Sequence, residues 1–163
     1  MFVIVLFSFA LVAAGTNILF SKKPMALKNI IGIFLLYILL INVGLGGLFA
    51  FCGHAFRSAE VAASIGWQTS PFQYEIAIAN LGLGVLGVLC LWLRGNFWTA
   101  TVIYGTVFGI GAGIGHIRQM IIYQNYAPNN AGVLLWFGDL FLPILMLTLL
   151  GAHNYLENKK AGE

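Results

Sequence analysis

The sequence predicts an all-α fold, a bundle of about five transmembrane helices that forms a single membrane domain over residues 1–163. Two observations carry this prediction: 60% of the 163 residues are hydrophobic and only 8% are charged, and the apolar residues form five long runs. An ordinary soluble domain has about 25% charged residues, and a soluble chain of this length could not bury so much apolar surface. A closed β-barrel would need alternating polar and apolar positions, which these continuous runs lack.

Each run is long enough to cross the hydrocarbon core of a bilayer as a helix, which takes about 20 residues. The first run could be mistaken for a signal peptide, but it lacks a basic N-terminal region and is followed at once by Lys22 and Lys23. We therefore expect it to be retained as a span. The polar tail from Asn154 onward is expected to be a linker. The expected spans are approximately residues 2–20, 29–52, 72–93, 97–123 and 132–152.

The connection between the second and third spans has a pattern of its own. Residues 58–67 are rich in small apolar side chains and end on Trp67, which suits a short helix that lies at the membrane interface. Ser70 and Pro71 would break this helix before the third span begins. We therefore expect an interfacial helix at about residues 58–67.

Basic residues predict the orientation of the chain. Threading five spans places six Lys and Arg residues on one side and leaves Arg57 and Arg118 on the other. Because Lys and Arg are enriched on the cytoplasmic side, we expect the N-terminus outside and the C-terminus in the cytoplasm. The six residues on the cytoplasmic side are Lys22, Lys23, Lys28, Arg94, Lys159 and Lys160.

Ionisable residues of the spans gather in the outer third of the expected bundle. Charged groups are costly in a membrane and usually face the bundle interior or a wet cavity. Gly105, Gly109 and Gly113 recur every four residues and His116 continues their row, so His116 faces closely packed neighbours. We expect one outward-opening polar pocket. Its expected metal ligands are His54, Glu75, His116 and Asp139, and its expected ligand-binding residues are Arg57, Glu60, Asn80, Arg118, Gln119 and Asn129.

Three functions are open for such a pocket. It could bind a divalent transition metal through imidazoles and carboxylates, or haem b, with His54 and His116 as axial ligands and two arginines on the propionates. It could bind a small organic or anionic ligand, or handle protons for transport. The third alternative is a structural or assembly subunit of a membrane complex, in which Arg118 pairs with Asp139 or Glu75.

No catalytic motif is recognised, so whether the chain is an enzyme is left uncertain, and no activity of its own is expected. HExxH and helical ExxH patterns are missing from the sequence, and no Ser or Cys has a base beside it. An oligomeric channel or transporter is a further alternative, although the chain is short and shows no inverted repeat. The expected partner is the lipid bilayer, with a homo-oligomer or a larger membrane complex permitted by the glycine-rich faces. The few basic residues form no patch for nucleic acid.

Other features are interpreted as packing. Gly82, Gly84 and Gly87 match a dinucleotide-binding fingerprint by letters, but they lie within an apolar span, which favours close helix packing. Cys52 and Cys90 are expected at different depths in the membrane and therefore without a disulfide between them. Interhelical hydrogen bonds are expected from three asparagines, Asn17, Asn42 and Asn80.

Two stretches of the chain carry a resemblance to a known family. The first contains Gly53-His54, residues 61–67, residues 70–75 and residues 79–80, and the second contains residues 115–120 and 125–132. On these residues the chain resembles a family of small bacterial multipass membrane proteins of unknown function, over roughly residues 30 to 150. The resemblance implies the inner membrane of a bacterium and makes the outer half of the molecule the expected functional region. It implies no activity or cofactor.

Overall fold

The computed structural model describes residues 1–21 and 24–161, and within these ranges every regular element is a helix. Five helical units are long and apolar enough to cross a membrane, which indicates a membrane protein. Lys22 and Lys23, which enter the orientation argument, lie outside the described residues. The units are α1 (Phe2–Leu19); α2 (Leu27–Tyr37) with the π-helical η1 (Ile38–Leu45) and α3 (Gly46–Phe56); α5 (Phe72–Leu89); α6 (Asn96–Tyr123); and α7 (Pro128–Ala131) with the π-helical η2 (Leu134–Phe141) and α8 (Leu142–Ala161).

The ends of two units differ from the sequence prediction. The third unit stops at Leu89, and residues 90–92 form a turn. The Trp98 indole donates a 2.9 Å hydrogen bond to the Cys90 carbonyl in this turn. The prediction of a linker from Asn154 onward is wrong, because α8 continues as a helix to Ala161. Glu157 at this end of α8 forms a salt bridge with Lys28 of α2, which helps to stabilise the helix beyond the apolar run.

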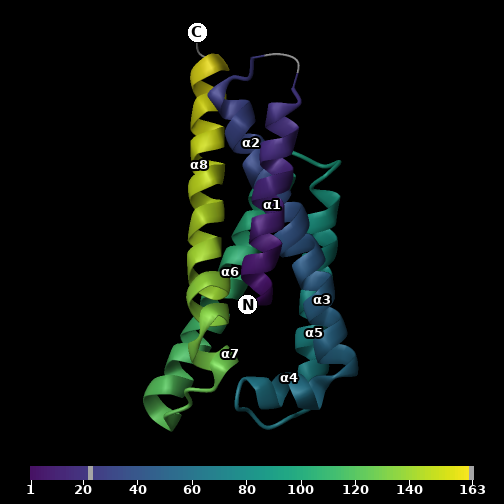
Figure 1. Cartoon of the computed structure of the whole chain (residues 1–163), viewed down its shortest axis with the longest axis vertical. Coiled ribbons are helices and arrows are strands. Elements are labelled where there is room, and N and C mark those ends of the chain that lie inside the picture. Colours follow the sequence, from purple (N-terminus) through teal and green to yellow (C-terminus); the bar gives the residue numbers. More distant parts are fainter. Residues whose placement is uncertain (22–23, 162–163) are drawn as a thin grey trace.

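The helices run alternately up and down the long axis of the molecule (Figure 1). At the end that carries the C-terminus, α2 packs against α8 and also against α1. Lys28 at the start of α2 forms a 2.9 Å salt bridge with Glu157 of α8. Near this end the Arg94 guanidinium lies 5.2 Å from the centre of the Trp98 ring, and Trp98 lies 5.8 Å from the ring of His153. Lys28 and Arg94 are therefore found toward the same end of the bundle.

At the opposite end the bundle divides into two groups of helices. Figure 1 shows α3 and α5 on one side, α6 with α7 on the other, and the short α4 (Ser58–Ser64) near this end. Asn125, which follows α6, donates a 2.8 Å hydrogen bond to the carbonyl of Ile65. Gly66 has a φ of +71°, and a Cβ there would lie 2.6 Å from the Asn125 side chain, so this junction requires glycine. A short helix does form where one was expected, and its location at a membrane interface stays a prediction.

Glycines bring α3 and α5 into backbone contact. A Cβ on Gly47 would lie 2.8 Å from the backbone nitrogen of Gly84, and a Cβ on Gly87 would overlap the backbone of Gly44. Small residues allow two helices to approach this closely in a membrane. The interpretation of Gly84 and Gly87 as packing residues is therefore confirmed, whereas a Cβ on Gly82 would meet nothing within 4 Å.

The glycine row of α6 packs against the break between η2 and α8. A Cβ on Gly109 would lie 2.9 Å from the Pro143 ring, and one on Gly113 would lie 3.3 Å from the Cβ of Asp139. Pro143 has no N–H group to donate to the carbonyl of Asp139, four residues earlier, so a regular α-helix is interrupted there. This explains why the irregular η2 segment precedes Pro143 and places Asp139 at the centre of the bundle.

Candidate functional site

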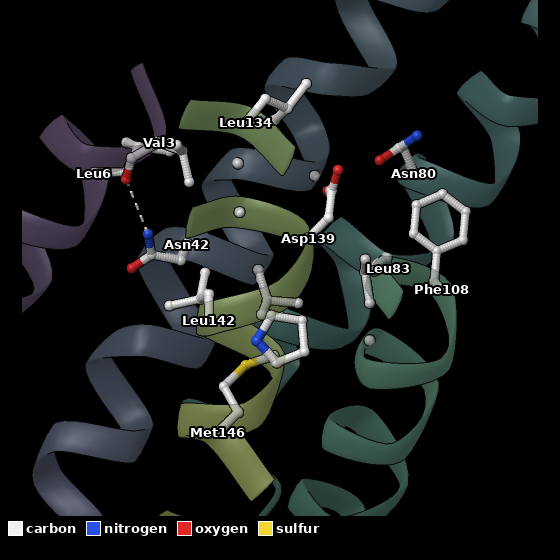
Figure 2. A pocket seen from close by; sticks show the side chains of 17 residues that line it. Val3, Leu6, Asn42, Asn80, Leu83, Phe108, Leu134, Asp139, Leu142 and Met146 are labelled. Carbon is white, nitrogen blue, oxygen red and sulfur yellow. Dashed lines mark hydrogen bonds between the residues drawn. The ribbon is translucent and has the colours of Figure 1, made fainter. Parts of the chain in front are cut away.

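A cavity of about 190 Å³ lies where all five spanning units meet. Its wall is mainly apolar, with residues from α1, from η1 and α3, from α5, from α6, and from η2 and α8. The polar side chains on the wall are Asn42, Asn80 and Asp139. Figure 2 shows the Asp139 carboxylate and the Asn80 amide directed toward the same space, with the Phe108 ring beside them.

The two π-helical segments each contribute one of these polar residues. Asn42 belongs to η1 and Asp139 to η2. A π-helical turn holds more residues than an α-helical turn, so it changes the face on which a side chain is presented, and such turns are frequent at functional sites. The irregular geometry of two spans therefore coincides with the polar part of the cavity wall.

Two residues that line the cavity each have a buried acceptor without a hydrogen-bond donor among the described residues. Asp139 Oδ2 is buried and accepts no hydrogen bond from the described residues, and the same is true of Asn42 Oδ1. None of the residues that line the cavity is Lys, Arg or His. A buried acceptor that stays unpaired is costly, so the cavity is chemically suited to a ligand that donates hydrogen bonds or carries positive charge.

The imidazole of His116, which is not among the residues that line the cavity, lies beside Asp139. Its Nε2 is 3.7 Å from Asp139 Oδ2, and its Nδ1 is 2.8 Å from Asn130 Oδ1. Asn130 is fully buried, at 0% exposure. The Trp67 ring covers the imidazole at a centroid distance of 5.6 Å. Residues of α7, of η2 and of the segment after α4 thus enclose His116 from three sides.

The structure brings together His116 and Asp139 but pairs the other histidine elsewhere. His54 Nδ1 lies 2.5 Å from Oε1 of Gln73, across the α3–α5 contact. Glu75 is exposed and forms no ion pair among the described residues. No group of three or more His, Cys, Asp or Glu side chains in residues 1–21 and 24–161 is spaced to hold a metal ion. The geometry therefore gives no support to a four-ligand metal centre.

The expected ligand-binding residues are dispersed. Asn80 lies on the cavity wall, whereas Arg57 and Glu60 pair with each other at the surface. The pairing of Arg118 with Asp139 or Glu75, which belonged to the structural alternative, is not among the ion pairs of the described residues, and the Arg118 guanidinium lies 5.8 Å from the centre of the Tyr123 ring. Gln119 and Asn129 do not line the cavity. Gln119 is half-buried, and its backbone carbonyl accepts a hydrogen bond from the backbone N–H of Asn125. Asn129 is exposed on α7.

Two of the three asparagine predictions are confirmed. Asn17 bonds to the hydroxyl of Tyr37 at 3.1 Å, and Asn42 reaches the carbonyl of Val3 at 3.5 Å, both between helices. The prediction for Asn80 is wrong, since its amide bonds to Ile76 in its own helix.

Sequence reasoning missed Gln73 and Asn130, the partners of the two histidines. Gln73 is buried one residue before Tyr74, and Asn130 is buried next to the exposed Asn129. The adjacent asparagines have the same chemistry in the sequence, so only their burial separates them. Gln73 lies near the end of a span, two residues before Glu75. An amide side chain at such a position is expected to form a hydrogen bond with a neighbouring helix, and this signal could have identified Gln73.

A second cavity, of about 490 Å³, lies between α3 and α4. Its charged residues are Arg57 and Glu60, which neutralise each other, and its other lining includes Cys52 and Phe56. Cys52 is exposed and Cys90 is buried, and both are free thiols, so the expectation of no disulfide is confirmed. Unlike the residues of the central cavity, none of its lining residues has a buried acceptor without a hydrogen bond in the part of the chain that the structure describes.

The fold and the central cavity define a class of protein: an all-helical chain with five units able to cross a membrane, in which the described residues place one carboxylate and two asparagines on a mainly apolar cavity wall. The chain belongs to a family of unknown function (DUF6790), which matches residues 1–159. No curated protein and no solved structure matches the sequence.

Proposed function

We propose that the protein binds a small organic cation, a protonated amine, in the central cavity. The observation that carries the proposal is Asp139, a carboxylate within a spanning unit that has no hydrogen-bond donor among the described residues. Ionisable groups that line membrane cavities commonly serve a ligand or ion. An ammonium group would supply both the donors and the positive charge that the wall lacks.

The size and lining of the cavity fit this class of ligand. A dry cavity of about 150 Å³ holds benzene, so the 190 Å³ here would admit an alkylammonium of about six to eight non-hydrogen atoms. Most of the wall would contact the alkyl part, and the Phe108 ring could attract the cationic head. A metal ion is not part of the proposal, because the described residues contain no group of three or more ligands for one. Haem b is not part of it either, because His54 is paired with Gln73 whereas His116 lies beside Asp139.

The setting of the site forms a second part of the proposal: the inner membrane of a bacterium, with the N-terminus outside and the C-terminus in the cytoplasm. The distribution of basic residues supports this orientation. Lys28 and Arg94 lie toward one end of the bundle. Arg57 directly follows α3 and Arg118 lies near the end of α6, and both helices run toward the opposite end. Basic residues favour the cytoplasmic side. The bacterial setting is supported by the resemblance described above.

The test is a titration of the purified protein in lipid nanodiscs with n-butylammonium chloride, followed by calorimetry. Wild-type protein is expected to bind, and Asp139→Asn is expected to weaken binding by about ten- to hundredfold, because a hydrogen bond to a charged group contributes about 1.5–3 kcal/mol. The matched control is Glu157→Gln, which removes a carboxylate at the far end of α8 and should leave the affinity unchanged.

The neutral analogue n-butanol separates charge recognition from simple filling of an apolar space. Equal binding of n-butanol and n-butylammonium, or equal binding by wild type and Asp139→Asn, would contradict the proposal.

A structural role is the second candidate, and open glycines on α6 favour it. A Cβ on Gly111 or Gly115 would meet nothing within 4 Å, so another helix could approach α6 closely there. Under this alternative, n-butylammonium does not bind. The purified protein is instead a homo-oligomer or part of a larger complex, and Gly115→Leu disperses it on a sizing column.

A further inference from the structure

Asn130 fixes which ring nitrogen of His116 carries a hydrogen. Asn130 Nδ2 lies 2.8 Å from the carbonyl oxygen of Asn125 and 3.3 Å from that of His116. A carbonyl oxygen only accepts hydrogen bonds, so the Asn130 atom that faces both must be the amide nitrogen, and the other must be Oδ1. Oδ1 also only accepts, and it lies 2.8 Å from His116 Nδ1. Nδ1 therefore donates and carries a hydrogen.

The second ring nitrogen of His116 faces a carboxylate. In a neutral imidazole with hydrogen on Nδ1, Nε2 presents a lone pair. This Nε2 lies 3.7 Å from Asp139 Oδ2, which has no hydrogen-bond donor among the described residues. Two acceptors would then oppose each other in a buried site, which is unfavourable. One additional proton, on either the imidazole or the carboxyl group, turns this repulsion into attraction.

Other charged groups are turned away from the pair. Around His116, α7 contributes the neutral Asn130 and the segment after α4 contributes the neutral Trp67, so Asp139 of η2 is its charged neighbour among the described residues. On α6 itself, Arg118 is exposed and lies over Tyr123. The remaining charged residues of this end are also occupied or exposed: Arg57 with Glu60 in an ion pair, and Glu75 at the surface of α5.

We infer that His116 and Asp139 hold one proton between them, and that an ammonium ion bound at Asp139 takes the place of that proton. The second half of this inference rests on the proposed function. Before binding, an imidazolium and a carboxylate sum to zero charge. On binding, the proton leaves His116 Nε2 for water, and the N–H groups of the ammonium take its place as donors between Nε2 and the carboxylate, so that the two acceptors are not left facing each other. A neutral imidazole, a carboxylate and an ammonium again sum to zero charge. The charge within the membrane is thus constant, which avoids the cost of an unpaired ion.

The proton pair is tested on the protein without ligand, by ¹⁵N NMR of histidine-labelled protein in nanodiscs. The signal of His116 is assigned by its loss in His116→Gln, since His54 and His153 remain. The expected spectrum shows Nδ1 protonated, with Nε2 either protonated or in a strong hydrogen bond that Asp139→Asn removes. A neutral ring with its hydrogen on Nε2 would overturn the inference.

The exchange is tested by titrating n-butylammonium near neutral pH in two buffers with different heats of protonation. The difference in heat is expected to report about one proton released per ammonium bound, and the His116 signal should change to a neutral ring with hydrogen on Nδ1. Binding without proton release would overturn the exchange and leave the proposed function standing. If n-butylammonium does not bind, the proposed function and the exchange fall together, while the spectrum of the free protein still decides the proton pair.

Discussion

Asn130 is a single residue whose hydrogen bonds hold the region around His116 together. It is fully buried and connects three partners: the His116 ring, the His116 carbonyl and the Asn125 carbonyl. Each such hydrogen bond contributes about 0.5–1.5 kcal/mol to stability, and a buried group left without its partner costs more than the mean value suggests. Adjacent Asn129 is exposed and should contribute little.

Replacing Asn130 therefore tests the local structure of the site. Asn130→Ala is expected to lower the free energy of unfolding by about 2 kcal/mol, since three hydrogen bonds are lost and the His116 ring is left with an unpaired donor. Asn129→Ala serves as the matched control and should change stability by less than about 0.5 kcal/mol. Denaturant titration in mixed micelles, followed by circular dichroism, measures both. Equal effects of the two substitutions would mean that the burial of Asn130 has been misjudged.

At this scale the sequence allowed a partial prediction of the site. His116 and Asp139 were expected in one pocket because both are ionisable residues in the outer third of the predicted bundle, and the structure places them 3.7 Å apart. His54 was expected in the same pocket, but it lies between α3 and α5, whereas His116 lies in the group of α6 and α7 (Figure 1). Helical periodicity could not predict that these two groups of helices separate at this end. A periodicity gives the face on which a residue lies, and it gives no information on which neighbouring helix covers that face.

The contact between α3 and α5 depends on the glycine backbone itself. Gly44 of η1 and Gly47 of α3 face two glycines of α5, Gly84 and Gly87. There is no room for a methyl group at Gly87. A glycine lowers the stability of a helix by about 1 kcal/mol relative to Ala. At these positions the close packing that glycine allows offsets this cost.

Gly87→Ala is expected to destabilise the protein by about 1–3 kcal/mol, as overpacking typically does. Gly82→Ala lies on the same helix in open space and should be neutral or stabilising by up to about 1 kcal/mol. The two variants differ only in what the new methyl group meets, so unfolding measured in the same micelles isolates the packing effect. A stable Gly87→Ala protein would show that α3 and α5 can separate without loss.

Element boundaries were predicted well in apolar sequence and poorly in polar sequence. Five apolar runs indicated five helices, and each run overlaps one of the described spanning units. The continuation of α8 to Ala161 was missed because hydropathy identifies only segments that are apolar enough to enter a membrane. The last turns of α8 are polar, and the salt bridge between Lys28 and Glu157 stabilises them as helix. The π-helical segments were also missed, since Pro143 signals an interruption but does not specify its form.

For the whole molecule, the orientation in the membrane can be tested by cysteine labelling. The background is Cys52→Ser, because Cys90 is buried. In intact spheroplasts a membrane-impermeant maleimide is expected to label Asn129→Cys on α7 and to label Lys159→Cys on α8 only after permeabilisation, as the distribution of basic residues predicts. The reverse pattern would invert the proposed orientation.

The salt bridge between α2 and α8 joins residues 129 positions apart in the chain, and the wall of the cavity draws on all five spanning units. During synthesis, four of these units leave the ribosome before Asp139 does. The cavity therefore cannot form before the last span has been synthesised. Asp139, the one carboxylate among the described residues of its wall, enters the membrane after His116. Premature termination anywhere before the final span would yield an inserted protein that lacks the site altogether.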